Sequence, residues 1–198
     1  MKKILLLILS VIVFYQAAQA EKLPLKGQII YANDTVDVTF IIPFSEISGQ
    51  INFIKLQQSV TYINSSNKKV KIKPTQAKEI RFKYGSGIQR MISVYNSISL
   101  GTLMEMDTCI FLKLNIDGNL KLFTYYAYGK YGVATSYIVK KTDAPIMAPD
   151  WISFRFDMKK FLSDCPVLVA KLEDKEYKAR DLESIVMFYN NTCGKKTF

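Results

Sequence analysis

The residues of this chain that could do chemistry are carboxylates and cysteines, because the sequence contains no histidine. Without histidine there is no Ser-His-Asp or Cys-His nucleophile, no imidazole general base and no imidazole metal ligand. Paired carboxylates could still hydrolyse glycosides, since that reaction needs two acids that flank the bond. The acids that could form such a pair are Glu105, Asp107, Asp143, Asp150 and Asp157.

Each of these acids also has an ordinary structural interpretation. Asp143 and Asp150 stand in a turn-rich link, and Asp157 is placed to cap a helix. Acids are common on the surface of any domain. We therefore predict no catalytic residue, no metal and no cofactor, and a carboxylate-dependent glycan hydrolase is the alternative function.

The three cysteines are too few for a structural zinc site without another soft ligand. Cys165 directly precedes Pro166, which suits the first position of a helix, and Cys193 follows an amphipathic stretch over 182–191. If these two helices run antiparallel, their ends bring the two cysteines together. We predict a Cys165–Cys193 disulfide with Cys109 as a buried free thiol, and the alternative is three unpaired buried cysteines.

The first twenty residues, MKKILLLILSVIVFYQAAQA, have the three parts of a secretory signal peptide. Two lysines precede an apolar run from Ile4 to Phe14, and Ala18 and Ala20 supply the small residues before the cleavage point. The run is shorter than the roughly 20 apolar residues that cross a membrane. We expect a signal peptide over 1–20, export to the periplasm or the medium, and no transmembrane segment after cleavage. Such compartments permit disulfides.

The formal net charge of +10 comes from scattered lysines and not from a basic tail, so we expect no nucleic-acid partner. For an exported chain, the partner could be an anionic envelope component or another envelope protein. Two basic rows, joined only by the short link PTQA, could form one face for an anionic ligand. They contain Lys69, Lys71, Lys73, Arg81 and Lys83. The alternative is an ordinary solvent-exposed face whose lysines discourage edge pairing.

Most of the segment 21–142 alternates between apolar and polar residues, which predicts antiparallel strands. Asp117-Gly118 predicts a two-residue hairpin turn between two of these strands. Residues assigned to inward rows are Val36, Val38, Phe40 and Ile42, then Val70 and Ile72, then Ile80, Phe82 and Tyr84, and finally Ile110, Leu112, Leu114 and Ile116 facing Leu120 and Leu122.

Helix signals follow a proline-containing link over 143–156. Asp157 and Asp181 are placed as N-terminal caps, so we expect a helical segment over 157–193. These few residues would bury too little surface alone, so the helices should pack on the sheet within a single domain, 21–198. Trp151, with Phe154 and Phe156, could stack on a sugar, but a lone tryptophan beside apolar residues favours a core position.

The expected fold class is therefore α+β, mainly an antiparallel curved sheet, half-barrel or sandwich with C-terminal helices packed on it. An outer-membrane β-barrel is disfavoured, because such chains generally end in a strand and CGKKTF follows a helix.

The segments KGQIIYANDTVDVTFIIP, INFIKLQQSVTYI, EIRFKYG and KLEDKEYKARDLESIVMFYNNTC resemble a family of uncharacterised exported proteins of Bacteroidota. The matching positions are Gly27, Ile29, Asn33, Asp34 and Thr35 in an early strand, and Tyr177, Asp181, Leu182, Ile185, Val186, Tyr189 and Asn190 in a closing helix. The resemblance covers most of the chain after residue 20 and implies an envelope or secreted location, a middle strand pair and no catalytic residue. We expect a non-enzymatic exported protein with a binding or structural role.

Overall fold

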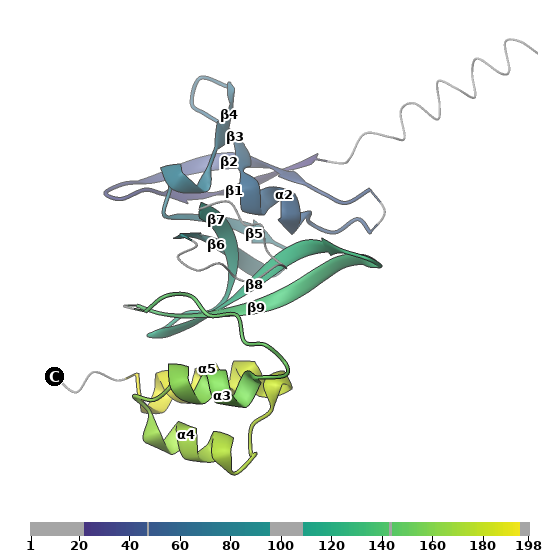
Figure 1. The fold of residues 1–198 in the computed structure, drawn as a ribbon. Coiled ribbons are helices and arrows are strands. Elements are labelled where there is room, and N and C mark those ends of the chain that lie inside the picture. The colour runs from purple at the N-terminus through teal and green to yellow at the C-terminus, as the bar shows by residue number, and fades with distance from the viewer. Residues whose placement is uncertain (1–21, 47, 96–108, 143, 195–198) are drawn as a thin grey trace, which may run out of the picture.

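The computed structural model describes residues 22–46, 48–95, 109–142 and 144–194 (Figure 1). In these residues a nine-stranded antiparallel sheet is followed by three C-terminal helices, which confirms the α+β prediction. The strands are β1 Lys22–Ile30, β2 Thr35–Pro43, β3 Val60–Ile63, β4 Lys69–Ile72, β5 Glu79–Tyr84, β6 Gly87–Tyr95, β7 Cys109–Ile116, β8 Leu120–Gly129 and β9 Gly132–Lys141. The helices are α2 Phe53–Gln58, α3 Phe154–Phe161, α4 Pro166–Glu173 and α5 Leu182–Thr192, with 3-10 turns η1 Pro74–Gln76 and η3 Ala179–Asp181.

The sheet consists of two meanders joined at its centre. Its strand order is β4-β3-β2-β1-β5-β6-β7-β8-β9, so β5 pairs with β1 and not with β4. The chain therefore passes from one edge of the sheet to its middle through η1. The sheet stays open, with β4 and β9 as its edges.

The sheet curves around α2. This helix contacts β2 and β3 and also β7 and β8, although five strands separate β3 from β8 in the sheet. Register places one side chain from each of five strands on the same side, where they are buried: Ile29, Phe40, Ile80, Met91 and Phe111. We call this side the inner face. The predicted alternation of β2, β4 and β5 is confirmed, because their apolar rows lie on this face.

The helix α2 is not among the predicted elements, and the resemblance implies a strand pair in this stretch. Asn52 caps the helix, since its Oδ1 accepts a hydrogen bond from the Lys55 N–H at 3.1 Å. Leu56 is fully buried in the core on the inner face. A six-residue helix offers too few residues for a periodic pattern, so its stability comes from packing.

The connection between β7 and β8 differs from the predicted two-residue turn. The strands end at Ile116 and begin at Leu120, and the pairing register shifts between Leu114 and Ile116. A one-residue shift sends the following side chain to the opposite face. Leu114 therefore packs on the outer face and Ile116 against the helices on the inner face, so the prediction of one continuous apolar row is wrong at Ile116.

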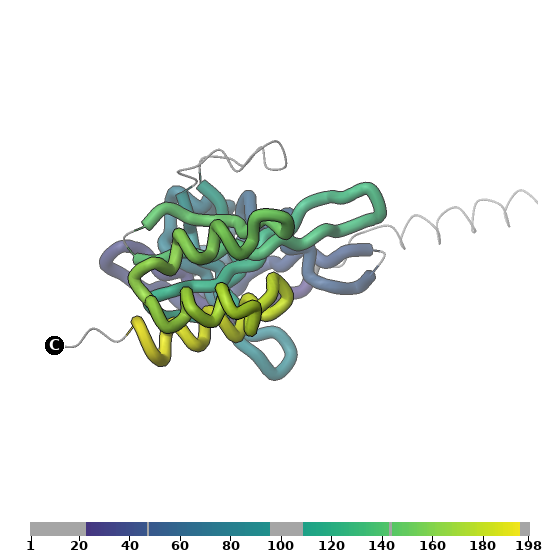
Figure 2. The backbone as a smooth tube through the Cα atoms, turned by 60° about the horizontal axis from the view of Figure 1, so that its bottom comes forward, coloured from purple at the N-terminus to yellow at the C-terminus, as the bar shows by residue number. Residues whose placement is uncertain are grey.

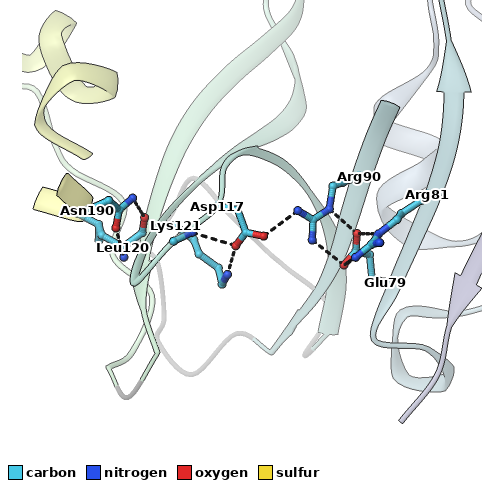
Figure 3. A network of polar contacts seen from close by, with 8 residues as sticks. Glu79, Arg81, Arg90, Asp117, Leu120, Lys121 and Asn190 are labelled. Carbon is cyan, nitrogen blue, oxygen red and sulfur yellow. Dashed lines mark hydrogen bonds and ion pairs between the residues drawn. The ribbon is translucent and has the colours of Figure 1, made fainter. Parts of the chain in front are cut away.

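Two side-chain amides complete the hydrogen bonding of β8 where β7 does not pair with it. β7 pairs with β8 only between Leu122 and Thr124. At Leu120 the backbone N–H donates to Asn190 Oδ1, and Asn190 Nδ2 donates to the backbone carbonyl, both at 2.8 Å (Figure 3). At Tyr126 the N–H donates to Gln57 Oε1 at 2.7 Å, and Gln57 Nε2 donates to the carbonyl at 2.9 Å. Each amide thus substitutes for a missing strand neighbour.

The contact between the Asn190 side chain and Leu120 requires a glycine at position 118. A Cβ atom at Gly118 would lie 2.5 Å from Asn190 Nδ2, and the φ angle of +153° is one that other residues rarely adopt. The glycine of the Asp117-Gly118 pair therefore makes room for a helix side chain and does not form a two-residue turn.

The C-terminal helices form a second layer beside β8 and β9, at the bottom of Figure 1 and at the front of Figure 2. They cover the inner face of these strands with a core that contains Leu120, Leu122, Val139, Met158, Leu168 and Ile185. The outer face of the same strands is covered in part by Ile146. Pro166 begins α4 as predicted, and Asp181 stands at the predicted N-cap position of α5. Its carboxylate makes no capping hydrogen bond to α5 and accepts one from the Lys178 N–H at 2.8 Å instead. The Asp157 prediction is wrong, because Ser153 is the N-cap of α3 and Asp157 lies in its first turn.

Cys165 and Cys193 form a disulfide-capable pair. Cys165 stands at the N-cap of α4 and Cys193 at the C-cap of α5, with Cα atoms 5.6 Å apart. This separation is typical of disulfides. Cys109 is buried at the start of β7, with its Sγ 3.1 Å from Ser93 Oγ. The predicted signal peptide lies outside the described residues, and none of the described helices is long and apolar enough to cross a membrane.

We predict that Gln57→Ala and Asn190→Ala each lower the free energy of unfolding by about 1–3 kcal/mol, since each leaves a partly buried backbone N–H and carbonyl without their partner. Urea unfolding of the protein measures this change. The matched controls are Gln58→Ala and Asn191→Ala, whose side chains are exposed one residue further along. Equal effects of the paired variants would contradict the role of the two amides.

We predict that peptide mapping without reducing agent finds Cys165 linked to Cys193, and Cys109 as a thiol that reacts only after unfolding. Closing the loop of 28 residues stabilises the fold by roughly 3–4 kcal/mol in the chain-entropy model. The double variant Cys165→Ser with Cys193→Ser should unfold at lower urea concentration, whereas Cys109→Ser should not release a new thiol. A bridge that contains Cys109 would overturn the assignment.

Candidate functional site

The two predicted basic rows do not lie on adjacent strands. Lys69 and Lys71 are on the edge strand β4, and Lys73 follows it, whereas Arg81 and Lys83 are on β5. Three strands separate β4 from β5, which is roughly 19 Å at the usual spacing. The short PTQA link does not make a hairpin because β5 pairs with β1 instead.

The two rows still share the outer face of the sheet. Cross-strand register aligns Lys69 with Ile63, Ile63 with Thr39 and Thr39 with Lys26. Arg81 and Lys83 line a shallow hollow of about 850 Å³ over β1, β2, β3 and β5, whereas the three lysines of the β4 row do not. The outer face thus carries separate cations and not one continuous stripe.

Arg81 is already engaged by a polar network that spans the outer face (Figure 3). Register sets Arg81 directly opposite Arg90, and the buried carboxylate of Glu79 binds both guanidinium groups. Arg90 Nη1 also donates to Asp117 Oδ2 at 2.7 Å, and Lys121 binds the other oxygen of Asp117.

The network shifts the pKa values of its members. Burial raises the pKa of Glu79, but hydrogen bonds from Arg90 and Arg81 outweigh it and hold that pKa below its ordinary value. Burial likewise opposes the hydrogen bonds from Lys121 and Arg90 that lower the pKa of Asp117 to about 2. Both carboxylates stay ionised at neutral pH, so these charges compensate one another and hold β5, β6 and the β7–β8 connection together.

The acids considered for hydrolysis do not form a described pair. Glu105, Asp107 and Asp143 lie outside the described residues. Asp150 accepts a hydrogen bond from the Ile152 N–H, and Asp157 accepts one from Ser153 Oγ, so both support the turn that leads into α3.

A more enclosed site lies on the inner face of the curved sheet. A cleft of about 710 Å³ is bounded by residues 44–46 and 48–55, the β5–β6 turn, β7 and the β8–β9 hairpin. Register places side chains from five strands on this face, namely Tyr84, Gln89, Lys113, Tyr126, Tyr128 and Val133. Its volume falls in the range of small-molecule sites.

Aromatic rings and one lysine make up the centre of this cleft. Phe53 of α2 stacks on Tyr126 of β8, with ring centroids 4.7 Å apart and planes inclined by 15°. Lys113 Nζ lies 5.1 Å from the centroid of the Phe53 ring, close enough for a cation–π interaction. The amide of Gln57 fixes Tyr126, so the wall is tied to the helix that carries Phe53.

Lys113 is half-buried, and burial alone lowers its pKa below the ordinary lysine value. The described residues place no carboxylate within ion-pair distance of its ammonium group. Glu46 is the one acid among the described lining residues, and it is exposed shortly after β2. A half-buried cation without a counter-ion among the described residues favours an anion from outside the protein.

The prediction from sequence did not include the cleft. The available signal was Lys113 itself. It is a charged residue in the same alternating row as Cys109 and Phe111, on a strand whose other row is apolar. The apolar row predicted for this strand contains Ile110 and Leu112 but not Phe111, whereas β7 is buried on both faces at these positions.

The predicted core position of Trp151 is wrong, because 78% of this residue is exposed. Phe156 is exposed as well, whereas Phe154 is buried.

No protein-family model matches this chain, and no curated protein or solved structure matches it. The resemblance to exported proteins of Bacteroidota therefore stays a prediction.

We predict that Glu79→Gln lowers stability at neutral pH by about 1–3 kcal/mol, because two opposed guanidinium groups lose their shared counter-ion. The folded-state pKa of Glu79 is lowered, so its contribution is fully present above its unfolded value near 4.5 and is lost as pH falls through the folded value. The variant should therefore show a flatter dependence of stability on pH in that acidic range.

Urea unfolding at a series of pH values checks this prediction. Glu183→Gln, an exposed change in α5, is the control. If both variants had the same pH dependence as the unchanged protein, the network would contribute no stability through Glu79.

Proposed function

We propose that this protein is an exported, non-catalytic binding protein whose inner-face cleft takes an amphipathic anion. The observation that supports the proposal best is Lys113, a half-buried cation without a described counter-ion among aromatic side chains. The apolar part of the ligand would contact Phe53, Tyr126 and Val133, and its carboxylate or phosphate would contact the ammonium group.

The chemistry of the cleft favours this ligand class over a neutral one. Burying an unpaired charge destabilises the protein, and an anion from outside removes that penalty in the complex. An ionised partner also makes a stronger hydrogen bond with the ammonium group than a neutral one does. Apolar surface in the same cleft adds affinity through the hydrophobic effect.

Two sequence features support the exported location in this proposal. One is the predicted signal peptide over 1–20, and the other is the disulfide-capable pair Cys165 and Cys193. An oxidising compartment would complete that bond.

The alternative of a glycan hydrolase has less support. The reaction needs two acids across the scissile bond, whereas the described lining of the cleft holds Glu46 alone. The side chains of Asp150 and Asp157 accept hydrogen bonds within the turn that leads into α3.

We predict that dodecanoate binds the protein at least roughly tenfold more tightly than dodecanol, because only the carboxylate pairs with Lys113. Isothermal titration calorimetry with the two compounds measures the difference. In Lys113→Met the preference for dodecanoate should disappear, while dodecanol still binds. The control Lys55→Met changes an exposed lysine on the rim and should keep the preference.

The pH dependence gives a second readout of the same prediction. Dodecanoate affinity should fall as pH rises through the lowered pKa of Lys113, below the ordinary lysine value of 10.5. Lys113→Arg should keep its affinity in that range, since arginine remains charged. Equal binding of both compounds by the unchanged protein, or no binding of either, would overturn the proposed function.

A further inference from the structure

Three large apolar side chains stand exposed where the chain enters α3. Trp151 is 78% exposed, Ile152 96% and Phe156 70%. They come from one turn and the first turn of the helix, so they form a contiguous group and not scattered single residues. Contiguous exposed apolar surface marks an interaction site more often than isolated residues do.

The local structure holds these side chains outward. Asp150 Oδ1 accepts a hydrogen bond from the Ile152 N–H at 3.0 Å, and Ser153 Oγ donates to Asp157 across the helix start. On the opposite side, Phe154 and Met158 pack into the core between the helices and the sheet. Trp151 and Phe156 are therefore held at the surface, because Phe154 and Met158 fix the opposite side of the helix in the core.

Cations surround the same apolar group. A shallow groove of about 720 Å³ runs between the start of α3 and the chain leading into η3. Its lining includes Trp151, Ile152 and Phe156 together with Arg155, Lys159, Lys178 and Arg180, and no acidic residue is among the described lining. We call these seven residues the α3–η3 patch.

We propose that the α3–η3 patch docks this protein on the surface of an anionic lipid bilayer. Tryptophan and phenylalanine insert at the boundary between headgroups and acyl chains, where their rings contact both. Lysine and arginine beside them pair with anionic headgroups. Lys159 and Arg180 lie near Glu173 and Asp181, whereas Arg155 and Lys178 have no ion pair among the described residues. Exposed apolar residues beside these cations match an anionic bilayer surface, and the match does not depend on the proposed ligand of the inner-face cleft.

Trp151 is the only tryptophan of the chain, so its fluorescence reports directly on the patch. Vesicles that contain phosphatidylglycerol should shift its emission to shorter wavelength and protect it from acrylamide quenching. Vesicles of phosphatidylcholine alone should do neither, and added NaCl should reverse the effect, because headgroup attraction is screened by salt. An unchanged spectrum with the anionic vesicles, or the same shift with both kinds, would overturn the proposal.

Two pairs of variants keep Trp151 as the reporter and separate the patch from general attraction. Arg155→Glu with Arg180→Glu should weaken partition by roughly fivefold for each cation removed. Lys69→Glu with Lys71→Glu makes the same change of net charge on β4 and should have a much smaller effect. Equal losses from the two charge variants would refute docking by this patch.

For the apolar part, Ile152→Ser with Phe156→Ser should weaken partition roughly tenfold. The control, Ile88→Ser with Tyr131→Ser, removes equally exposed apolar side chains elsewhere and should leave partition unchanged. Sedimentation tests the competing occupant: a dimer that depends on Ile152 and Phe156, without vesicle binding, would assign the patch to a second copy of this chain instead.

Discussion

The architecture depends on the hydrogen bonding of one strand, β8. Its backbone must be satisfied along its whole length, but β7 pairs with it only briefly because the register shifts between Leu114 and Ile116. Gln57 and Asn190 supply donors and acceptors on either side of the stretch that β7 pairs, at Tyr126 and Leu120. One amide comes from α2 inside the curve of the sheet and the other from α5 in the helical layer. The same strand thus positions both layers, and without these contacts the sheet would expose polar groups where the helices now pack.

Curvature then determines what the inner face can do. Along most of its length this face is a closed apolar core, and at β8 and β9 the C-terminal helices cover it. Between these two regions Lys113 lies half-buried beside Phe53 and Tyr126. An apolar residue at 113 would pack at lower cost, since burying an ammonium group without a counter-ion is unfavourable. A residue such as Lys113, which lowers the stability of the fold and lines a cleft, is explained by a role in binding.

The cations of the outer face behave differently from Lys113. Arg81 and Arg90 lie directly opposite each other on the adjacent strands β5 and β6. Glu79 and Asp117 neutralise them with hydrogen-bonded ion pairs. These charges stabilise the packing of neighbouring strands. The cations of the α3–η3 patch surround exposed apolar rings instead, with only Lys159 and Arg180 near acids. Cations of the described residues thus have different surroundings in structural ion pairs, in the inner-face cleft and in the α3–η3 patch, which composition alone does not distinguish.

Local chemistry made part of this structure predictable from sequence. Alternation identified β2, β4 and β5 because one face of each is buried. Proline and aspartate marked the starts of α4 and α5 because the preferences of residues at a helix start are local. The position of Cys165 beside Cys193 followed from the same helix ends. By itself the sequence determined the α+β class and the helix boundaries near Pro166 and Asp181. Only the tertiary structure decided the pairing of β5 with β1, the shift in β7, the exposure of Trp151 and the surroundings of Lys113. These depend on contacts between residues far apart in the chain, and no local pattern encodes which strand becomes the neighbour of which.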